Sequence, residues 1–176
     1  MLPCLEAEIG SNILQNRQKF VEQMSNLLFD PVRGQHVEKT PEEIVRQRLL
    51  QYLSKVCGIP LSLIAVEKCL HEMPHLSHVK PSQVRRTDIV CYAHDFHPHH
   101  NLYPLILAEC KAKTITPLAV EQALGYNTQI GAPYVLLASA DELRLYLPRL
   151  ENDPLHFLPH LLPYEELVQR AKSFYA

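Results

Sequence analysis

The chain lacks several features that would assign it to a large class of proteins. It has no hydrophobic signal segment and no apolar run long enough to span a bilayer, so we expect a cytoplasmic protein with no membrane partner. Its 17 Lys and Arg against 19 Asp and Glu exclude a generally polycationic nucleic-acid binder, which leaves a local patch or metal ions for such a role. The five cysteines include no Cys-x-x-Cys pair, so reduced and mostly buried thiols are expected.

What is present suits one globular domain. The 176 residues are 47% hydrophobic, enough for a real core. Along this single domain we expect an N-terminal helix and loop over residues 1–35, a core over 36–150 and a C-terminal extension with a helix over 151–176.

Hydrophobic spacing, caps and chain breakers predict the elements. Helices are expected over residues 11–28, from Thr40 to a stop at Gly58, over 117–130 and over 164–175; the second has the apolar stripe Val45, Leu49, Leu53 and Val56. Strands are expected over 61–70, 86–92, 105–110, 134–138 and 142–147, with loops over 30–34 and 71–83 and a hairpin connection over 93–101. This order predicts an α/β fold with a mixed sheet flanked by helices.

The most informative stretch is Leu105-Ile-Leu-Ala-Glu-Cys-Lys111, an apolar run that ends in two charges. The run is typical of a central strand that is buried on both faces. Because side chains alternate along a strand, Glu109 and Lys111 should share one side and Cys110 should point to the other. Charges at the end of a buried strand are unfavourable unless something shares the site. A divalent cation on the carboxylate, with the lysine handling a water or a phosphate, is an economical explanation.

Other polar residues are expected near this strand end. Asp88 lies in a strand that should pair with it, and Glu43 lies in the first turn of the second helix. Gln122 and Tyr126 are four residues apart on the helix that follows, on the face with Leu118, Ala119 and Ile130 that we expect to pack on the sheet. A glutamine on a buried stripe needs a polar partner, which the end of the Glu109 strand would supply.

Six short segments follow one another along the chain: Asp30-Pro-Val-Arg33, Thr40-Pro-Glu-Glu-Ile-Val-Arg-Gln47, Val66-Glu67, Arg86-Thr-Asp88, Glu109-Cys-Lys111 and Gln122-Ala-Leu-Gly-Tyr-Asn127. Together they resemble the PD-(D/E)xK nuclease superfamily, and more closely the nuclease domain at the N-terminus of type I restriction enzyme R subunits and its stand-alone relatives. The sequence departs from the pattern in having threonine before Asp88 instead of proline. It also lacks the Gly-x-x-x-x-Gly-Lys-Ser/Thr motif of a helicase motor, so ATP-driven cleavage is not expected of this chain alone.

The resemblance implies a restriction-endonuclease-like fold and Mg²⁺-dependent hydrolysis of DNA phosphodiester bonds, with Mn²⁺ as a substitute metal. Asp88 and Glu109 would ligate the metal, with Glu43 as an accessory acid. Lys111 would orient or activate the attacking water, and Gln122 and Tyr126 would steady the substrate. Arg86 is a candidate for phosphate contact. DNA is the expected partner, and a homodimer and a restriction-system or helicase partner are left open.

Each assignment has a structural alternative. Thr40-x-x-Glu43 is a capping box, which alone could explain Glu43. Glu109 and Lys111 could be an exposed pair, and Gln122 and Tyr126 could be ordinary packing residues. For the whole protein the alternative is a non-catalytic nucleic-acid-binding or partner-docking module that retains the nuclease fold.

Histidines crowd two predicted loops. His71, His75 and His78 fall in one, and the other contains His94, His97, His99 and His100. Such spacing could bind Zn²⁺, but Pro98 and the lack of cysteine or carboxylate companions favour solvated loops.

Overall fold

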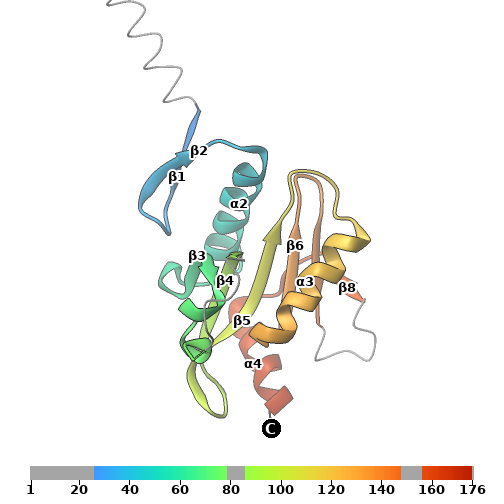
Figure 1. The fold of residues 1–176 in the computed structure, drawn as a ribbon. Coiled ribbons are helices and arrows are strands. Elements are labelled where there is room, and N and C mark those ends of the chain that lie inside the picture. The colour runs from blue at the N-terminus through green and yellow to red at the C-terminus, as the bar shows by residue number, and fades with distance from the viewer. Residues whose placement is uncertain (1–25, 79–85, 148–155, 176) are drawn as a thin grey trace, which may run out of the picture.

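A central mixed sheet organises the computed structural model, which describes residues 26–78, 86–147 and 156–175. Six strands lie in the order β3-β4-β5-β6-β7-β8, and β5 and β6 run parallel whereas the other neighbours are antiparallel. The strands are β3 (Ile64–Cys69), β4 (Arg86–His97), β5 (His100–Cys110), β6 (Tyr134–Ala138), β7 (Leu143–Tyr146) and β8 (Phe157–Leu158). A separate hairpin of β1 (Leu27–Asp30) and β2 (Gln35–Glu38) lies beside the first helix in Figure 1. The predicted α/β fold with a mixed sheet is confirmed.

Among the described residues, three α-helices cover the two faces of the sheet. Helix α2 (Pro41–Gln51) begins at the predicted cap Thr40, and α3 (Pro117–Ile130) spans the predicted range and ends at Gly131, whose φ of 77° suits a glycine. Helix α4 (Tyr164–Tyr175) also spans its predicted range. Apolar residues of α2 and α4 share one core with the sheet, and α3 packs on the other face (Figure 1).

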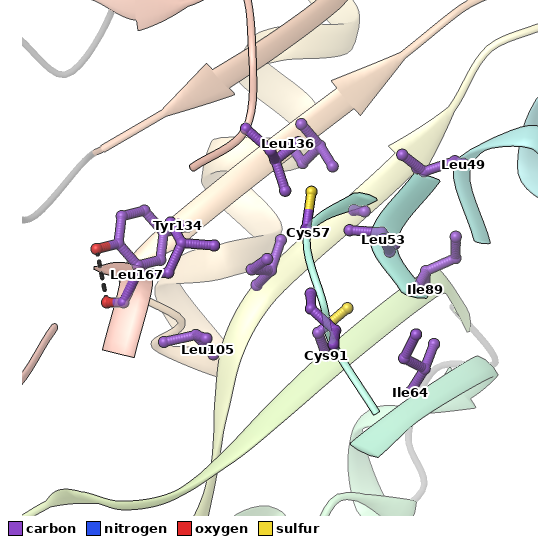
Figure 2. Close-up of a cluster of buried hydrophobic side chains, with 14 of the residues drawn as sticks. Leu49, Leu53, Cys57, Ile64, Ile89, Cys91, Leu105, Tyr134, Leu136 and Leu167 are labelled. Atoms are coloured by element: carbon purple, nitrogen blue, oxygen red, sulfur yellow. Dashed lines mark hydrogen bonds between the residues drawn. The ribbon is translucent and has the colours of Figure 1, made fainter. Parts of the chain in front are cut away.

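The larger core lies between the sheet and the α2 and α4 layer. Figure 2 shows Leu49 of α2, and Leu53 of the π-helical turn that follows it, facing Ile89 and Leu136 of the sheet. Tyr134 is fully buried there, and its hydroxyl donates a hydrogen bond to the Leu167 carbonyl at 3.0 Å, which ties β6 to α4. The cysteines within the described residues are buried free thiols: Cys57, Cys69, Cys91 and Cys110. Burial raises the pKa of Cys57 to about 11, so this thiol stays protonated and inert near neutral pH.

One expectation at the start of the chain was wrong. Leu27 and Leu28 belong to strand β1 and not to a helix over 11–28, whose remaining residues up to 25 lie outside the described part. The expected loop over 30–34 is confirmed: it is the turn of the β1–β2 hairpin, closed by a Gly34 N–H donating to the Asp30 carbonyl at 2.9 Å. The second helix does not keep its α-helical spacing to the end, because a π-helical turn over Tyr52–Val56 follows α2. Val56, expected on the apolar stripe, is therefore 66% exposed.

The two longest strands, β4 and β5, were underestimated. Residues 93–101 are mostly the continuation of β4 and β5 and not a hairpin connection. The pairing of β4 with β5 is irregular between His94 and His97, where Asp95 adopts a left-handed φ of 55°. Phe96 is buried just after it, so the strand still contributes to the core beyond the polar residues. Strand β3 begins at Ile64 instead of residue 61, and short 3₁₀ turns occupy part of the loop expected over 71–83. Strand β8 was not predicted.

Candidate active site

A row of carboxylates crosses three neighbouring strands at one end of the sheet. The pairs Val66–Ile89 and Lys68–Thr87 place Glu67 of β3 beside Asp88 of β4. The Ile89–Ala108 pair, extended by one residue, places Asp88 opposite Glu109 of β5. Like charges in adjacent cross-strand positions repel one another, so this row requires cations. Glu67 also adopts a left-handed φ of 51°, a strained conformation for a residue other than glycine.

Arg46 supplies one of those cations. Its side chain is 10% exposed, and its Nη2 donates to Asp88 Oδ1 at 2.7 Å. The Nη1 group contacts Glu43 Oε2 and also lies 3.3 Å from Glu67 Oε1. Burial alone would lower the pKa of Arg46, but the charges of Asp88 and Glu43 raise it above its ordinary value. Arg46 therefore joins helix α2 to the carboxylates of β3 and β4 as a fixed positive charge.

Arg33, at the turn of the β1–β2 hairpin, supplies the second cation. Its Nε lies 2.7 Å from Asp30 Oδ2, its Nη2 lies 2.7 Å from Glu43 Oε1, and its Nη1 lies 3.2 Å from Glu67 Oε2. Asp30 is fully buried and accepts backbone N–H bonds from Val32 and Arg33. Burial alone would raise the pKa of Asp30, but these hydrogen bonds and the Arg33 guanidinium hold it below its ordinary value. The hairpin is therefore attached to the site by a charged carboxylate.

Glu43 joins the two arginines. Thr40 caps α2 by accepting the Glu43 N–H at 3.1 Å, as predicted. In a capping box the Glu43 carboxylate would accept the Thr40 N–H, but this N–H donates to the Glu38 carbonyl instead. The Glu43 carboxylate faces Arg33, Arg46 and the Gln47 amide, the last at 2.8 Å. The capping box alone thus does not explain Glu43, whose side chain belongs to the acid–arginine network.

Glu109 and Lys111 lie together at the end of β5. The Lys111 Nζ is 3.5 Å from Glu109 Oε2, and the side chains are 31% and 11% exposed respectively. Because the Glu109 side chain is mostly buried, the exposed-pair alternative does not describe it. The Lys111 N–H donates to the Ala138 carbonyl at 2.8 Å, and the Cys110 N–H donates to Asp88 Oδ2 at 2.7 Å. Cys110 packs in the core with α2 and α4, as its position in the strand predicted.

The helix residues lie differently from expectation. Tyr126 is buried beside Val90, Tyr92 and Leu107, whereas Gln122 is exposed and Leu118 is 62% exposed. The helix rests on the sheet through Val120, Ala123, Asn127 and Ile130, so the expectation that Gln122 lies on the packed face was wrong. Asn127 is the polar residue of that face, and its amide exchanges hydrogen bonds with the backbone of Ala132. Arg86 is exposed at the start of β4.

Several residues of the site had no assigned role in the sequence-based prediction: Asp30, Arg33, Arg46, Gln47 and Glu67. The sequence of α2 holds a signal for part of this set: Glu43, Arg46 and Gln47 are spaced to share one face of the helix, and all three are buried. Three charged or polar side chains on one buried stripe require one another or a ligand. Their partners on the hairpin and on β3 lie too far along the chain for spacing to indicate them.

The histidines gather at the opposite end of β4 and β5. His97 stacks on Tyr103 with ring centroids 4.1 Å apart, and His100 and His75 also contact that ring. These residues form an aromatic cluster, so the expectation of solvated loops was wrong for them. Within the described ranges, which include all seven loop histidines, no three His, Cys, Asp or Glu side chains form a ready-made metal site.

The end of the sheet that carries Asp88 and Glu109, here called the acid end, has an excess of negative charge that a divalent cation would offset. Five carboxylates face three cationic groups, which leaves a net charge of −2 when all are ionised: Asp30, Glu43, Glu67, Asp88 and Glu109 against Arg33, Arg46 and Lys111. Mg²⁺ accepts a site with only one or two protein carboxylates because it keeps several waters. Asp88 and Glu109, adjacent on neighbouring strands, fit that requirement by donor chemistry, and Arg46 holds one oxygen of Asp88.

Comparison with known proteins adds a family. A family model described as the N-terminus of the type I restriction enzyme R protein matches residues 41–161, which include α2, the whole six-stranded sheet and α3. No curated protein and no solved structure matches the chain. In the part of the chain that the structure describes, none of the helices has the length and apolar character needed to cross a membrane.

Proposed function

Because the chain belongs to the family of type I restriction enzyme R protein N-termini, we propose that it is a Mg²⁺-dependent endonuclease that hydrolyses phosphodiester bonds of DNA. The observation that carries the proposal is the strand end where Asp88, Glu109 and Lys111 meet, inside a site with two more carboxylates than cationic groups. We extend to these residues the PD-(D/E)xK assignment that the resemblance implies.

Asp88 and Glu109 would hold the metal, with Mn²⁺ as a substitute for Mg²⁺. A bound metal would lower the pKa of a water and offset negative charge on the phosphate. Lys111 is tied to β6 through its backbone, and its ammonium lies on a partly exposed side chain beside Glu109, where it would hold the attacking water or a phosphate oxygen. Glu43 would act from a distance, by keeping Arg33 and Arg46 in place.

The substrate would approach from the exposed side of the site. Arg86 and Gln122 are exposed and could contact the DNA backbone, whereas buried Tyr126 would act by supporting α3. Two kinds of partner belong to the same proposal. A second copy of the chain would cut the second DNA strand, and a partner from a restriction system would supply the motor.

The test is cleavage of supercoiled plasmid, linear duplex and single-stranded DNA in Mg²⁺, Mn²⁺ or EDTA. Lys111→Ala should reduce metal-dependent cleavage by about 100-fold or more, the usual effect of losing a group that stabilises the transition state or transfers a proton. Lys55→Ala is the matched control, because Lys55 is an exposed lysine just beyond α2.

Equal cleavage by the wild type and Lys111→Ala would rule out this mechanism. DNA binding that needs no metal, with no metal binding and no cleavage of any DNA form, would favour the docking-module alternative over the nuclease.

A further inference from the structure

Arg46 occupies the carboxylate that the metal would need. We propose that Arg46 is a positioning residue that holds Asp88 in the metal-free protein and releases it when a divalent cation binds. This inference rests on the proposed function, since it concerns the same metal site.

The hydrogen bonds of Asp88 provide the first argument. Its Oδ2 accepts the Cys110 N–H at 2.7 Å and its Oδ1 accepts Arg46 Nη2 at 2.7 Å, so both oxygens are engaged. The backbone bond fixes the orientation of the carboxylate and is compatible with a metal. The Arg46 guanidinium is not compatible with a metal, because its positive charge would repel a cation bound to the same carboxylate at close range. Metal binding and the Arg46–Asp88 bond therefore compete.

Comparison of the two arginines provides the second argument. Arg33 uses Nε, Nη1 and Nη2, each with its own carboxylate. Arg46 uses only its two Nη groups, and its Nε is buried with no hydrogen-bond partner among the described residues. A buried donor without an acceptor is unfavourable, so the Arg46 arrangement is the less completely satisfied of the two.

The remaining contacts show how Arg46 could leave Asp88 without leaving the site. Glu43 lies one helical turn before Arg46 on α2, and Glu67 is 38% exposed beside it. These two carboxylates can keep the guanidinium when Asp88 is released. Arg46 would then remain next to the metal with Nη2 available, a geometry suited to a phosphate oxygen.

Arg46→Gln and Arg33→Gln form the matched pair for the test. Both remove a guanidinium from Glu43 and Glu67, and only the first removes a contact to Asp88. Mn²⁺ affinity, measured by electron paramagnetic resonance, should tighten by about tenfold in Arg46→Gln, a typical size for coupling at a metal site. It should stay close to the wild-type value in Arg33→Gln, and Arg46→Lys should fall between the wild type and Arg46→Gln.

A second measurement needs no substitution. The Nε–H signals of Arg46 and Arg33 in a ¹⁵N NMR spectrum should respond differently to Mg²⁺, with a large shift for Arg46 and a small one for Arg33. This readout keeps the inference testable if Arg46→Gln does not fold.

The outcomes separate the two proposals. Equal Mn²⁺ affinity in the wild type and Arg46→Gln, or an Arg46 signal that does not move at saturating Mg²⁺, would overturn the role of Arg46 and leave the nuclease intact. A metal-dependent Arg46 shift with no cleavage of any DNA form would support that role while contradicting the nuclease.

Discussion

The two ends of the β4–β5 ribbon collect titratable side chains in opposite ways. At one end, Asp88 and Glu109 belong to a network held by charge–charge contacts with arginine and lysine. At the other end, His97, His100 and Tyr103 are held by ring stacking, and His97 also meets Tyr175 of α4. The same pair of strands thus carries an ionic region and an aromatic region.

The two regions differ in whether their charges are balanced by the protein itself. The acid end retains a net negative charge after all its cations are counted, so a cation would relieve it. At the histidine end the rings pack on Tyr103 and on one another. His75 Nε2 donates to the Ile130 carbonyl at 2.8 Å, which leaves Nδ1 as the unprotonated nitrogen, buried and with no hydrogen-bond partner in the described residues. Excess negative charge at the acid end is where cation binding is expected, whereas the packed rings of the histidine end contribute to stability.

The largest expected contrast is in activity. Asp88→Asn removes one metal-binding charge and should lower DNA cleavage by about 100-fold or more in the plasmid assay. His100→Gln, at the far end of the same ribbon, should stay within about twofold of the wild type because it touches only the aromatic cluster. A comparable loss in His100→Gln would show that the two ends are not functionally separate.

The next contrast is in stability. Glu43→Gln leaves the buried Arg46 guanidinium and the partly buried Arg33 guanidinium without their shared carboxylate, so urea denaturation should show a loss of about 3 kcal/mol in the free energy of unfolding. Glu166→Gln breaks an exposed i,i+4 pair with Arg170 and should change it by less than about 0.5 kcal/mol. Equal effects would mean that the acid–arginine network does not stabilise the fold.

The histidine end should respond to pH. Burial lowers the pKa of His75 below its ordinary value of 6.5, with smaller effects of the same sign from His100 and His78 and an opposing effect from the Ile130 carbonyl. Below about pH 6.5 the unfolded chain binds a proton at His75 that the folded protein resists, so stability falls as the pH is lowered through this range. At higher pH the residue is neutral in both states and contributes no pH dependence.

Thermal unfolding between pH 7.5 and 5.5 tests this expectation. His75→Gln should lose less stability than the wild type over that interval, by a difference smaller than the effect of Glu43→Gln. The exposed His160→Gln should follow the wild type. A wild-type slope retained in His75→Gln would assign the pH dependence to other groups.

The smallest effect concerns local protection. Mg²⁺ should slow amide exchange at the ends of β4 and β5 that carry Asp88 and Glu109, where it would bind, and leave residues 94–103 unchanged. Equal protection at both ends would indicate a general stabilisation and not a site.

Local sequence was sufficient for most of the elements and for part of the site. The aliphatic run before Glu109 required a buried strand, and alternation along it correctly separated Cys110 from the charged pair. Proline and threonine at the helix starts, with Gly131 at the end of α3, set helix limits that the structure confirms. The motif segments indicated the family that the comparison shows.

Tertiary structure decided the rest. Helical spacing gave Gln122 and Leu118 a place on a buried stripe, but the face of α3 that packs depends on the sheet it meets, and both residues are exposed. The role of Glu43 was open between a cap and a site residue until Arg33 of the hairpin and Arg46 of its own helix were seen to share its carboxylate. Caps, turns and alternation act over a few residues and can be found in a sequence. Neutralising a row of carboxylates from three strands requires partners that only the folded chain brings together.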